Sequence, residues 1–235
     1  MRVLHVISSI DLRAGGPAVA MAGLAKAQRG AGLDVAVLAT WRKGASNDVG
    51  DDLTHTGIHV TRVGPARGPL ARHRQIAPAL RAEMQQADVV HIHGLWEEVQ
   101  HQAARVARKL GRRYIITPHG MLTPWSLRQK WLKKKIYMSL RLGRDLRQAS
   151  AIHYTTAMER DLVAPLKLAP PAIVETLGVE LQEFENLPAK GSFRGKHQQL
   201  NNKRIMLFLG RLHPGKGMEY LIPSPFPDAA GRETA

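Results

Sequence analysis

The sequence predicts an α/β domain built on a doubly wound parallel sheet, and three observations support this fold class. Short apolar runs alternate along the chain with segments of helical period. The apolar runs lack polar alternation, which is typical of strands buried on both faces of a sheet. Glycine and proline separate many of the segments, as at Gly64-Pro65. Strands that are joined through helices pair in parallel, so we expect helices on both faces of one sheet.

The elements follow one another regularly. The first predicted strand, 3–7, precedes a Gly-Gly-Pro turn and a helix over about 18–29 that ends at Gly30. Further strands are predicted at 35–39, 58–63, 89–93, 114–117, 151–154 and 172–174, and further helices at about 72–86, 97–110 and 127–148. Functional loops in such folds follow the carboxyl ends of the strands. We therefore expect the chemistry just after Ile7, Ile92 and Thr117.

The chain is predicted to hold one domain and the start of a second. Residues 1–185 form the first, and 186–203, rich in Pro, Lys, Gly, Gln and Asn, are a linker. A new buried strand, 204–209, and a glycine-rich loop open a second α/β domain within 204–222. The tail, 223–235, begins with three prolines in five residues and lacks helical period. We expect the second domain to be truncated, through a genuine truncation or a frame change in the gene.

Composition limits the classes of function. The 235 residues are 44% hydrophobic and 23% charged, enough apolar surface for a sizeable core. The net charge of +15 favours polyanionic partners: nucleic acid, anionic lipid headgroups or phosphate-bearing small molecules. The absence of cysteine excludes disulfides, cysteine-ligated metals and thiol catalysis. No apolar stretch is long enough for a membrane span or a secretory signal, so we expect a cytoplasmic protein.

Gly15-Gly16, after the first strand, is the first candidate site. Glycines between a strand and a helix let backbone N–H groups approach a phosphate closely, although an ordinary tight turn is the simpler explanation of a glycine pair on its own. The dinucleotide-binding and P-loop patterns are both absent from the sequence.

Three histidines fall at predicted strand ends. His91 and His93 share one strand face, a spacing that metal ligands also use, but no third ligand is evident nearby and we expect no metal. His119 lies between Pro118 and Gly120 in an exposed loop at a strand's carboxyl end, which suits a functional or a structural role.

Residues 128–147 carry eight basic residues and one acid. Apolar side chains recur there every four residues, with tryptophans nearby. This pattern suits a helix that lies on an anionic membrane through Trp131, Lys133, Lys134 and Lys135. The alternative is a core-packed helix with a solvated basic face. Specific nucleic-acid binding is not expected, because no helix-turn-helix, zinc-finger or RNP pattern accompanies the charge.

Arg211 and Lys216 flank a glycine-rich loop after the strand at 204–209. Two cations on such a loop supply the charge and the close approach that a diphosphate needs.

Together these segments resemble the N-terminal, Rossmann-like half of a GT-B glycosyltransferase of family 4, the retaining group-1 enzymes. The resemblance rests on M-R-V-L-H-V with its glycine pair, H-I-H-G-L-W at 91–96, T-P-H-G-M-L-T-P-W-S-L at 117–127, H-Y-T-T-A-M-E at 153–159 and F-L-G-R-L-H-P-G-K-G at 208–217. Order and spacing agree over about 220 residues.

The resemblance implies roles for residues. Gly15 and Gly16 would line the cleft near the donor phosphate, His119 would contact the donor sugar, and Arg211 and Lys216 would hold the leaving nucleotide diphosphate. Glu159 matches a family glutamate with a structural role. The partners implied are a nucleotide sugar and a glycan or lipid-linked acceptor of polysaccharide biosynthesis, and no metal is needed.

The sequence departs from the family at two places. The turn usually read as Asn-Gly-Val-Asp is Leu-Gly-Val-Glu at 177–180. The glutamate pair that grips the donor belongs to the second domain and does not occur. We therefore expect this chain to have little or no transferase activity alone. The alternative is a non-catalytic remnant that binds a membrane or a partner enzyme.

Overall fold

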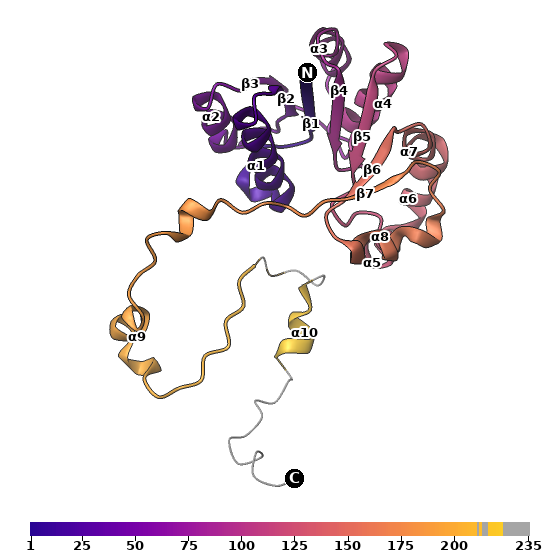
Figure 1. Ribbon diagram of the computed structural model, residues 1–235. Helices are drawn as coiled ribbons and strands as arrows, with labels where there is room; N and C mark the ends of the chain where they lie inside the picture. Colours follow the sequence, from indigo (N-terminus) through magenta and orange to yellow (C-terminus); the bar gives the residue numbers. More distant parts are fainter. Residues whose placement is uncertain (211, 213–215, 223–235) are drawn as a thin grey trace. The chain divides into compact units, whose positions relative to one another are not determined.

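The computed structural model describes residues 1–210, 212 and 216–222, and it divides between Glu180 and Leu181 into two compact units. The first unit contains one sheet of seven parallel strands in the order β3-β2-β1-β4-β5-β6-β7 (Figure 1). The strands are β1 (Arg2–Ile7), β2 (Asp34–Thr40), β3 (His59–Val63), β4 (Val89–His93), β5 (Arg113–Thr117), β6 (Ala151–Tyr154) and β7 (Ala172–Val174). The predicted fold class and the seven strands predicted in this unit are confirmed.

The strand order contains a switch point. The chain moves outward from β1 to β3 and then returns to place β4 on the other side of β1. Loops that leave β1 and β4 therefore turn to opposite sides of the sheet, and in open α/β folds ligands bind at such a point.

Helices cover both faces of the sheet. Alternate strand residues point to opposite faces, so β1 sends Leu4 and Val6 into one core and Ile7 into the other. The core containing Leu4 includes residues of α3 (Ile76–Met84) and α4 (Glu98–Lys109), and the second core includes residues of α1 (Gly16–Gly30) and α2 (Asp48–His55). Each fully buried leucine or isoleucine contributes about 2 kcal/mol.

Helix α2 is absent from the sequence-based prediction. It is only eight residues long, too short to show a clear period, and Val49 and Leu53 are its buried apolar pair. Asp48 and Asp51 in its first turn favour a helix start, because acidic groups interact well with free N–H groups there.

The basic segment is not the single helix predicted over 127–148. It consists of α5 (Pro124–Arg128), α6 (Trp131–Tyr137), a π-helix η2 (Met138–Leu142) and α7 (Gly143–Arg147). Lys130, with φ 52°, has left-handed backbone and separates α5 from α6. A Cβ on Gly143 would lie 2.8 Å from the Met138 carbonyl oxygen, so glycine accommodates the π-helix.

Short helices complete the description. They are η1 (Leu12–Ala14), α8 (Ala157–Val163) and η3 (Ala164–Leu166) in the first unit, and η4 (Leu181–Phe184), α9 (Ser192–Lys196), η5 (Gln198–Leu200) and α10 (Met218–Leu221) in the second. The strand predicted over 204–209 is not formed, and Leu207 and Leu209 are 80% and 92% exposed. Within the described part of the chain, no helix has the length and apolar character to cross a membrane.

Candidate functional site

Four histidines and a threonine gather on one face of the sheet at the switch point. The β1–β4 register places His5 opposite His91, and the β4–β5 register places His93 opposite Thr117. His153, on β6, continues the group. All five side chains are buried. They therefore satisfy their hydrogen bonds from one another and from their immediate neighbours.

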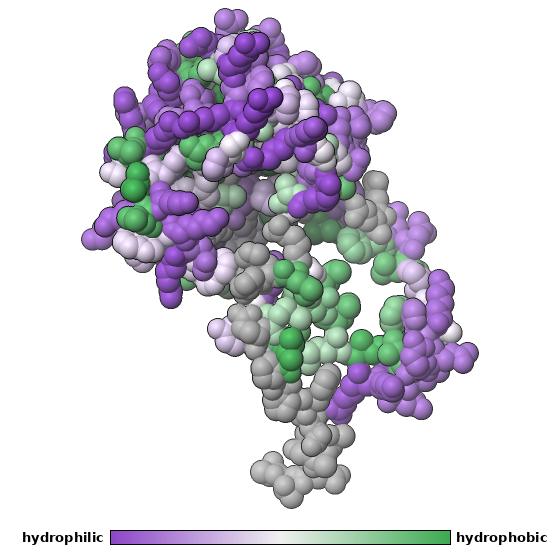
Figure 2. All heavy atoms as spheres, turned by 180° about the vertical axis from the view of Figure 1, so that it is seen from behind, coloured by the Kyte–Doolittle hydropathy of each residue, from purple (hydrophilic) through white to green (hydrophobic). Residues whose placement is uncertain are grey.

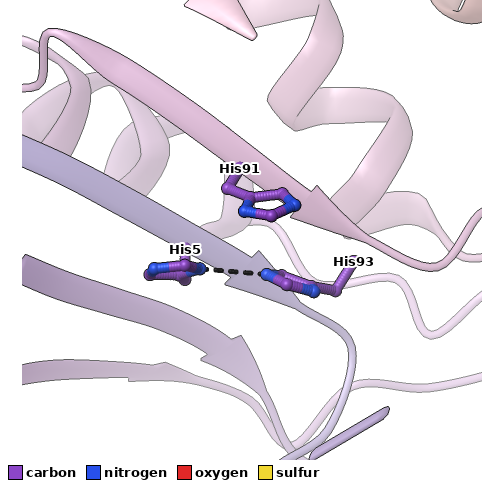
Figure 3. A group of neighbouring side chains, drawn as sticks. All are labelled: His5, His91 and His93. Carbon is purple, nitrogen blue, oxygen red and sulfur yellow. Dashed lines mark hydrogen bonds between the residues drawn. The ribbon is translucent and has the colours of Figure 1, made fainter. Parts of the chain in front are cut away.

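A first row of hydrogen bonds runs from α1 across the switch point. His5 Nε2 lies 2.7 Å from Gln28 Oε1, and His5 Nδ1 lies 2.9 Å from His93 Nε2, the bond drawn in Figure 3. His93 Nδ1 then lies 3.1 Å from Nε2 of His119. The row links α1 to the loop after β5.

A second row crosses the sheet beside the first. His91 Nε2 lies 2.6 Å from Thr117 Oγ1, which lies 2.8 Å from His153 Nδ1. His153 Nε2 donates to the Glu175 carbonyl oxygen over 3.0 Å. The two rows meet where the rings of His91 and His93 stack, with centroids 4.2 Å apart.

Burial favours the neutral imidazole at His5, His91, His93 and His119. Desolvation lowers the pKa of His5 and of His119 to about 4. It also lowers the pKa of His91 and His93 well below the usual value, and repulsion from neighbouring histidines adds to this. A neutral imidazole has one N–H donor and one lone pair, so each ring can pass a hydrogen bond along its row.

The structure places His5 beside His91 and His93 and so provides the third possible metal ligand that the sequence did not reveal. Nitrogens of His5, His91 and His93 lie within 4.8 Å of one another. However, the facing nitrogens of His5 and His93 point at each other over 2.9 Å, whereas a tetrahedral zinc ion with bonds of about 2.0–2.1 Å separates its ligand nitrogens by about 3.3 Å. The rings are oriented for hydrogen bonding, with His91 above rather than beside the pair (Figure 3).

The loop that carries His119 is held by Glu159 of α8. His119 has left-handed backbone, with φ 51°, a conformation that costs about 1 kcal/mol or more for a residue other than glycine. Glu159, buried at the start of α8, accepts hydrogen bonds from Gly120 N over 2.6 Å, Thr155 N over 3.1 Å and Thr155 Oγ1 over 3.0 Å. Thr156 caps the helix by accepting from Glu159 N. The carboxylate therefore compensates the strained loop.

We expect Glu159→Gln to destabilise the protein by about 2 kcal/mol, because hydrogen bonds to a buried charged group are worth about 1.5–3 kcal/mol each. Glutamine has one oxygen where glutamate has two, so its amide would face an N–H donor at Gly120 or Thr155. Urea unfolding and amide exchange at Gly120 measure the effect. Glu175→Gln, at an exposed position, is the control, and equal stability of both variants would contradict this role.

Neither hydrogen-bond row includes any other predicted site residue that the structure describes. Gly15 and Gly16 occupy the start of α1, after β1. Gly15 has φ 102° and needs glycine, whereas a Cβ on Gly16 would meet nothing within 4 Å. Lys216 is exposed in the second unit, and Arg211 lies outside the described residues.

The predicted membrane residues differ among themselves. Trp131, Lys133 and Lys135 are exposed on α6, where green side chains stand among purple ones at the left edge of Figure 2. Lys134 is half-buried: Nζ donates to the Ser126 carbonyl oxygen over 2.5 Å and lies 5.0 Å from the Trp96 ring centre. Lys134 therefore has an intramolecular role that the sequence pattern does not reveal.

An open, basic pocket of about 420 Å³ lies where α3 and α4 begin. Its Glu98 is paired with Arg141 at 2.8 Å and with Arg72 at 3.6 Å. The pocket is lined by Arg72, His73, Arg74, Ile76, Ala77, Glu98 and Gln102.

Comparison with known families decides the relationship. A model described as a glycosyl transferase 4-like domain matches residues 15–179, which include α1, β4, the His119 loop and β7. The chain belongs to this family. The resemblance found in the sequence motifs is thus confirmed.

Individual relatives of this glycosyl transferase 4-like chain are distant. A GDP-mannose:cellobiosyl-diphosphopolyprenol alpha-mannosyltransferase of Xanthomonas campestris is 24% identical over 233 residues, covering 93% of the chain and 54% of the relative. The chain thus spans about half the length of that enzyme. The crystal structure of Anabaena HepE in complex with UDP and glucose matches with a TM-score of 0.68 and 18% identity, over 94% of this chain and 56% of HepE.

Another solved structure has a similar fold. A glycosyltransferase from Rickettsia africae has a TM-score of 0.56 and 16% identity, over 86% of this chain and 50% of that protein. At such identities the solved structures establish the α/β fold, and function has to be argued from the site.

Proposed function

We propose that the protein is a glycosyltransferase of glycan biosynthesis that moves a sugar from a nucleotide donor to a glycan or lipid-linked acceptor, with retention of configuration. The glycosyl transferase 4-like domain over residues 15–179 is the observation that carries the proposal. The Xanthomonas relative uses GDP-mannose and a diphosphopolyprenol acceptor, and HepE was crystallised with UDP and glucose. Both names are consistent with a nucleotide-sugar donor.

The proposed roles follow from the chemistry of sugar transfer. Positive character develops on the sugar in the transition state, and negative charge develops on the departing phosphate. Arg211 and Lys216 would stabilise that phosphate more in the transition state than in the ground state, which accelerates transfer. The N–H groups of Gly15 and Gly16 would approach the donor phosphate, and His119 would bind a sugar hydroxyl. No metal enters this scheme.

Donor binding can be tested on the chain itself. We expect GDP-mannose or UDP-glucose to shift the ¹⁵N–¹H signals of His119, Gly120 and Gly16. Gly16→Ala should fold normally, since its Cβ meets nothing within 4 Å, yet weaken this binding by crowding the ligand. Gly23→Ala, equally unhindered in α1, is the matched control. If neither nucleotide sugar shifts these signals, donor binding at this site is wrong.

Retention is tested through the product. Little transfer is expected from this chain alone, but whatever product it forms from an α-linked nucleotide sugar and a diphosphopolyprenol glycan should be α-linked, which NMR coupling constants identify. A β-linked product would contradict the proposed retaining mechanism.

We further propose that the segment α6–η2 places the protein on an anionic membrane, on the inner face of the cytoplasmic membrane. The specific observation is that its apolar stripe does not pack into the core: Leu132, Ile136 and Leu140 are 55%, 52% and 76% exposed. Trp131, Lys133 and Lys135 stand exposed beside it. Apolar side chains flanked by cations suit a headgroup region, and each lysine near an anionic surface is worth about 1 kcal/mol.

We expect Lys133→Gln with Lys135→Gln to lower binding to phosphatidylglycerol-containing vesicles by about tenfold or more, as each lost cation weakens attraction to the surface. Lys134 is left in place because it bonds Ser126. Co-sedimentation measures the change. Arg81→Gln with Lys109→Gln removes the same charge from exposed positions on α3 and α4. Equal losses in the two double variants would mean that bulk charge, not this segment, binds the vesicles.

A further inference from the structure

We propose that Gln28 and the histidines of the first row set the tautomer of His119, with the proton on Nε2 and the lone pair on Nδ1. Gln28, His5 and His93 are then positioning residues that act on His119 from α1 across the switch point. The bonds that carry the proposal are Gln28–His5 at 2.7 Å, His5–His93 at 2.9 Å and His93–His119 at 3.1 Å.

The second row shows how one group at its end determines which atom donates and which accepts in every hydrogen bond of a row. The Glu175 carbonyl oxygen can only accept, so His153 must donate from Nε2 and accept at Nδ1. Thr117 then donates its hydroxyl proton to His153 and accepts from His91 Nε2. One acceptor at the end of the row therefore fixes every proton along it.

The first row follows the same logic with the Gln28 amide oriented as in the structure, with Oε1 rather than the NH₂ group towards His5. Gln28 presents Oε1 to His5 Nε2, so this nitrogen donates and His5 Nδ1 accepts. His5 Nδ1 then accepts a hydrogen bond from the N–H of His93 Nε2, and His93 Nδ1 accepts one from the N–H of His119 Nε2. His5 and His93 are 0% and 2% exposed, so water cannot easily replace a partner and relax the order.

This order of donors and acceptors determines which ring nitrogen stays free in His119, at the half-buried end of the row. His119 is left with Nδ1, which has no hydrogen-bond partner among the described residues, as its free acceptor. The use of this acceptor rests on the proposed function: Nδ1 would accept a hydrogen bond from a hydroxyl of the donor sugar. The Gln28 amide, at the far end, would thus determine whether the site accepts from or donates to that hydroxyl.

The test changes Gln28 so that the donor and acceptor order of the hydrogen bonds in the first row is either kept or reversed. Gln28 is half-buried on α1, where Gln28→Glu places an acceptor and Gln28→Lys places a donor beside His5. In the ¹⁵N-histidine-labelled chain at pH 7.5, we expect wild type and Gln28→Glu to keep His119 protonated on Nε2. Gln28→Lys should move the proton to Nδ1 and change the tautomer ratio by about fivefold, the factor that corresponds to the net worth of one hydrogen bond, about 1 kcal/mol. Imidazole ¹⁵N shifts identify the protonated nitrogen.

A second measurement needs no variant. Scalar couplings across the N–H···N bonds should join His93 Nε2 to His5 Nδ1 and His119 Nε2 to His93 Nδ1 in the wild-type chain. Absence of these couplings, or a His119 tautomer that is the same in Gln28→Glu and Gln28→Lys, would overturn the proposal.

The readout also separates this proposal from the proposed function. His91→Leu cuts the second row only and should leave the tautomer of His119 unchanged. If the tautomers follow Gln28 but no nucleotide sugar perturbs His119, the row stands and the proposed contact of His119 with the donor fails. If a nucleotide sugar binds but the tautomer of His119 is the same in all Gln28 variants, the role of the row fails and the proposed donor binding stands.

Discussion

The free energy of unfolding should fall steeply as the pH is lowered from 6.5 towards 4. In the unfolded chain each histidine takes up a proton near pH 6.5. In the folded chain burial holds the pKa of His5 and His119 near about 4. Between these values the unfolded state binds more protons, so lowering the pH stabilises it relative to the folded state. The contribution of these buried histidines to the free energy of unfolding is therefore fully present above pH 6.5 and is lost as the pH falls.

The expected magnitude is large. For His5 and His119 the loss by pH 5 is on the order of 2 kcal/mol each, and His91 and His93, whose pKa values are lowered by the same burial, add to it. Proteins of this size are stable by only about 5–15 kcal/mol. Acid should therefore unfold the protein in the range where most buried carboxylates are still ionised.

Urea unfolding at pH 7.5, 6.5, 5.5 and 4.5 measures this dependence. His5→Asn should flatten the slope by up to about 1.4 kcal/mol per pH unit, whatever it does to stability at neutral pH. His55→Asn, at an exposed position on α2, is the control, because it replaces a histidine outside the rows. A stability that is flat between pH 6.5 and 4.5 would mean that the histidine rows are open to water.

Much of the first unit could be predicted because its strands are continuous apolar runs. The local pattern sufficed for β1 to β7, and the position of His119 after a strand pointed to the loop that we propose contacts the donor. The pattern was insufficient where backbone geometry depends on one residue. The left-handed Lys130 and the π-helix before Gly143 break the basic segment, and nothing in its charge or period indicates either.

The histidine rows illustrate a different limit. His5 and His91 are far apart in the sequence, and only the strand order makes β1 and β4 neighbours. Parity along each strand does place His5, His91 and His93 on alternate positions, so each could be assigned to a face. Which strands are adjacent, and hence that Gln28 terminates the row, required the structure. Likewise, the apolar run 204–209 resembles a strand in isolation but has no strand neighbour among the described residues.

We expect Asp145→Ala to destabilise the protein by about 3 kcal/mol. Asp145, on α7, is 2% exposed and lies 2.8 Å from Arg108 Nη2 and 2.7 Å from His101 Nδ1, both on α4. Removing one partner of a buried ion pair leaves the other charge desolvated, which costs about 3–5 kcal/mol. The side chains of Arg108 and His101 keep 18% and 16% exposure, so the lower end of this range applies.

Urea unfolding at pH 7.5 measures the loss, and Asp161→Ala is the matched control. Asp161 pairs with Arg160 at 2.8 Å, but its side chain is 66% exposed, so its removal should cost less than about 1 kcal/mol. The cause is separated by the double variant Arg108→Met with Asp145→Leu, which leaves no desolvated charge at this pair and should recover part of the stability lost in Asp145→Ala. A double variant no more stable than Asp145→Ala would show that the loss comes from packing or from His101. Because α7 continues from α6 and η2, the same ion pair also anchors the exposed basic segment, so Asp145→Ala should weaken vesicle binding at temperatures where the domain itself remains folded.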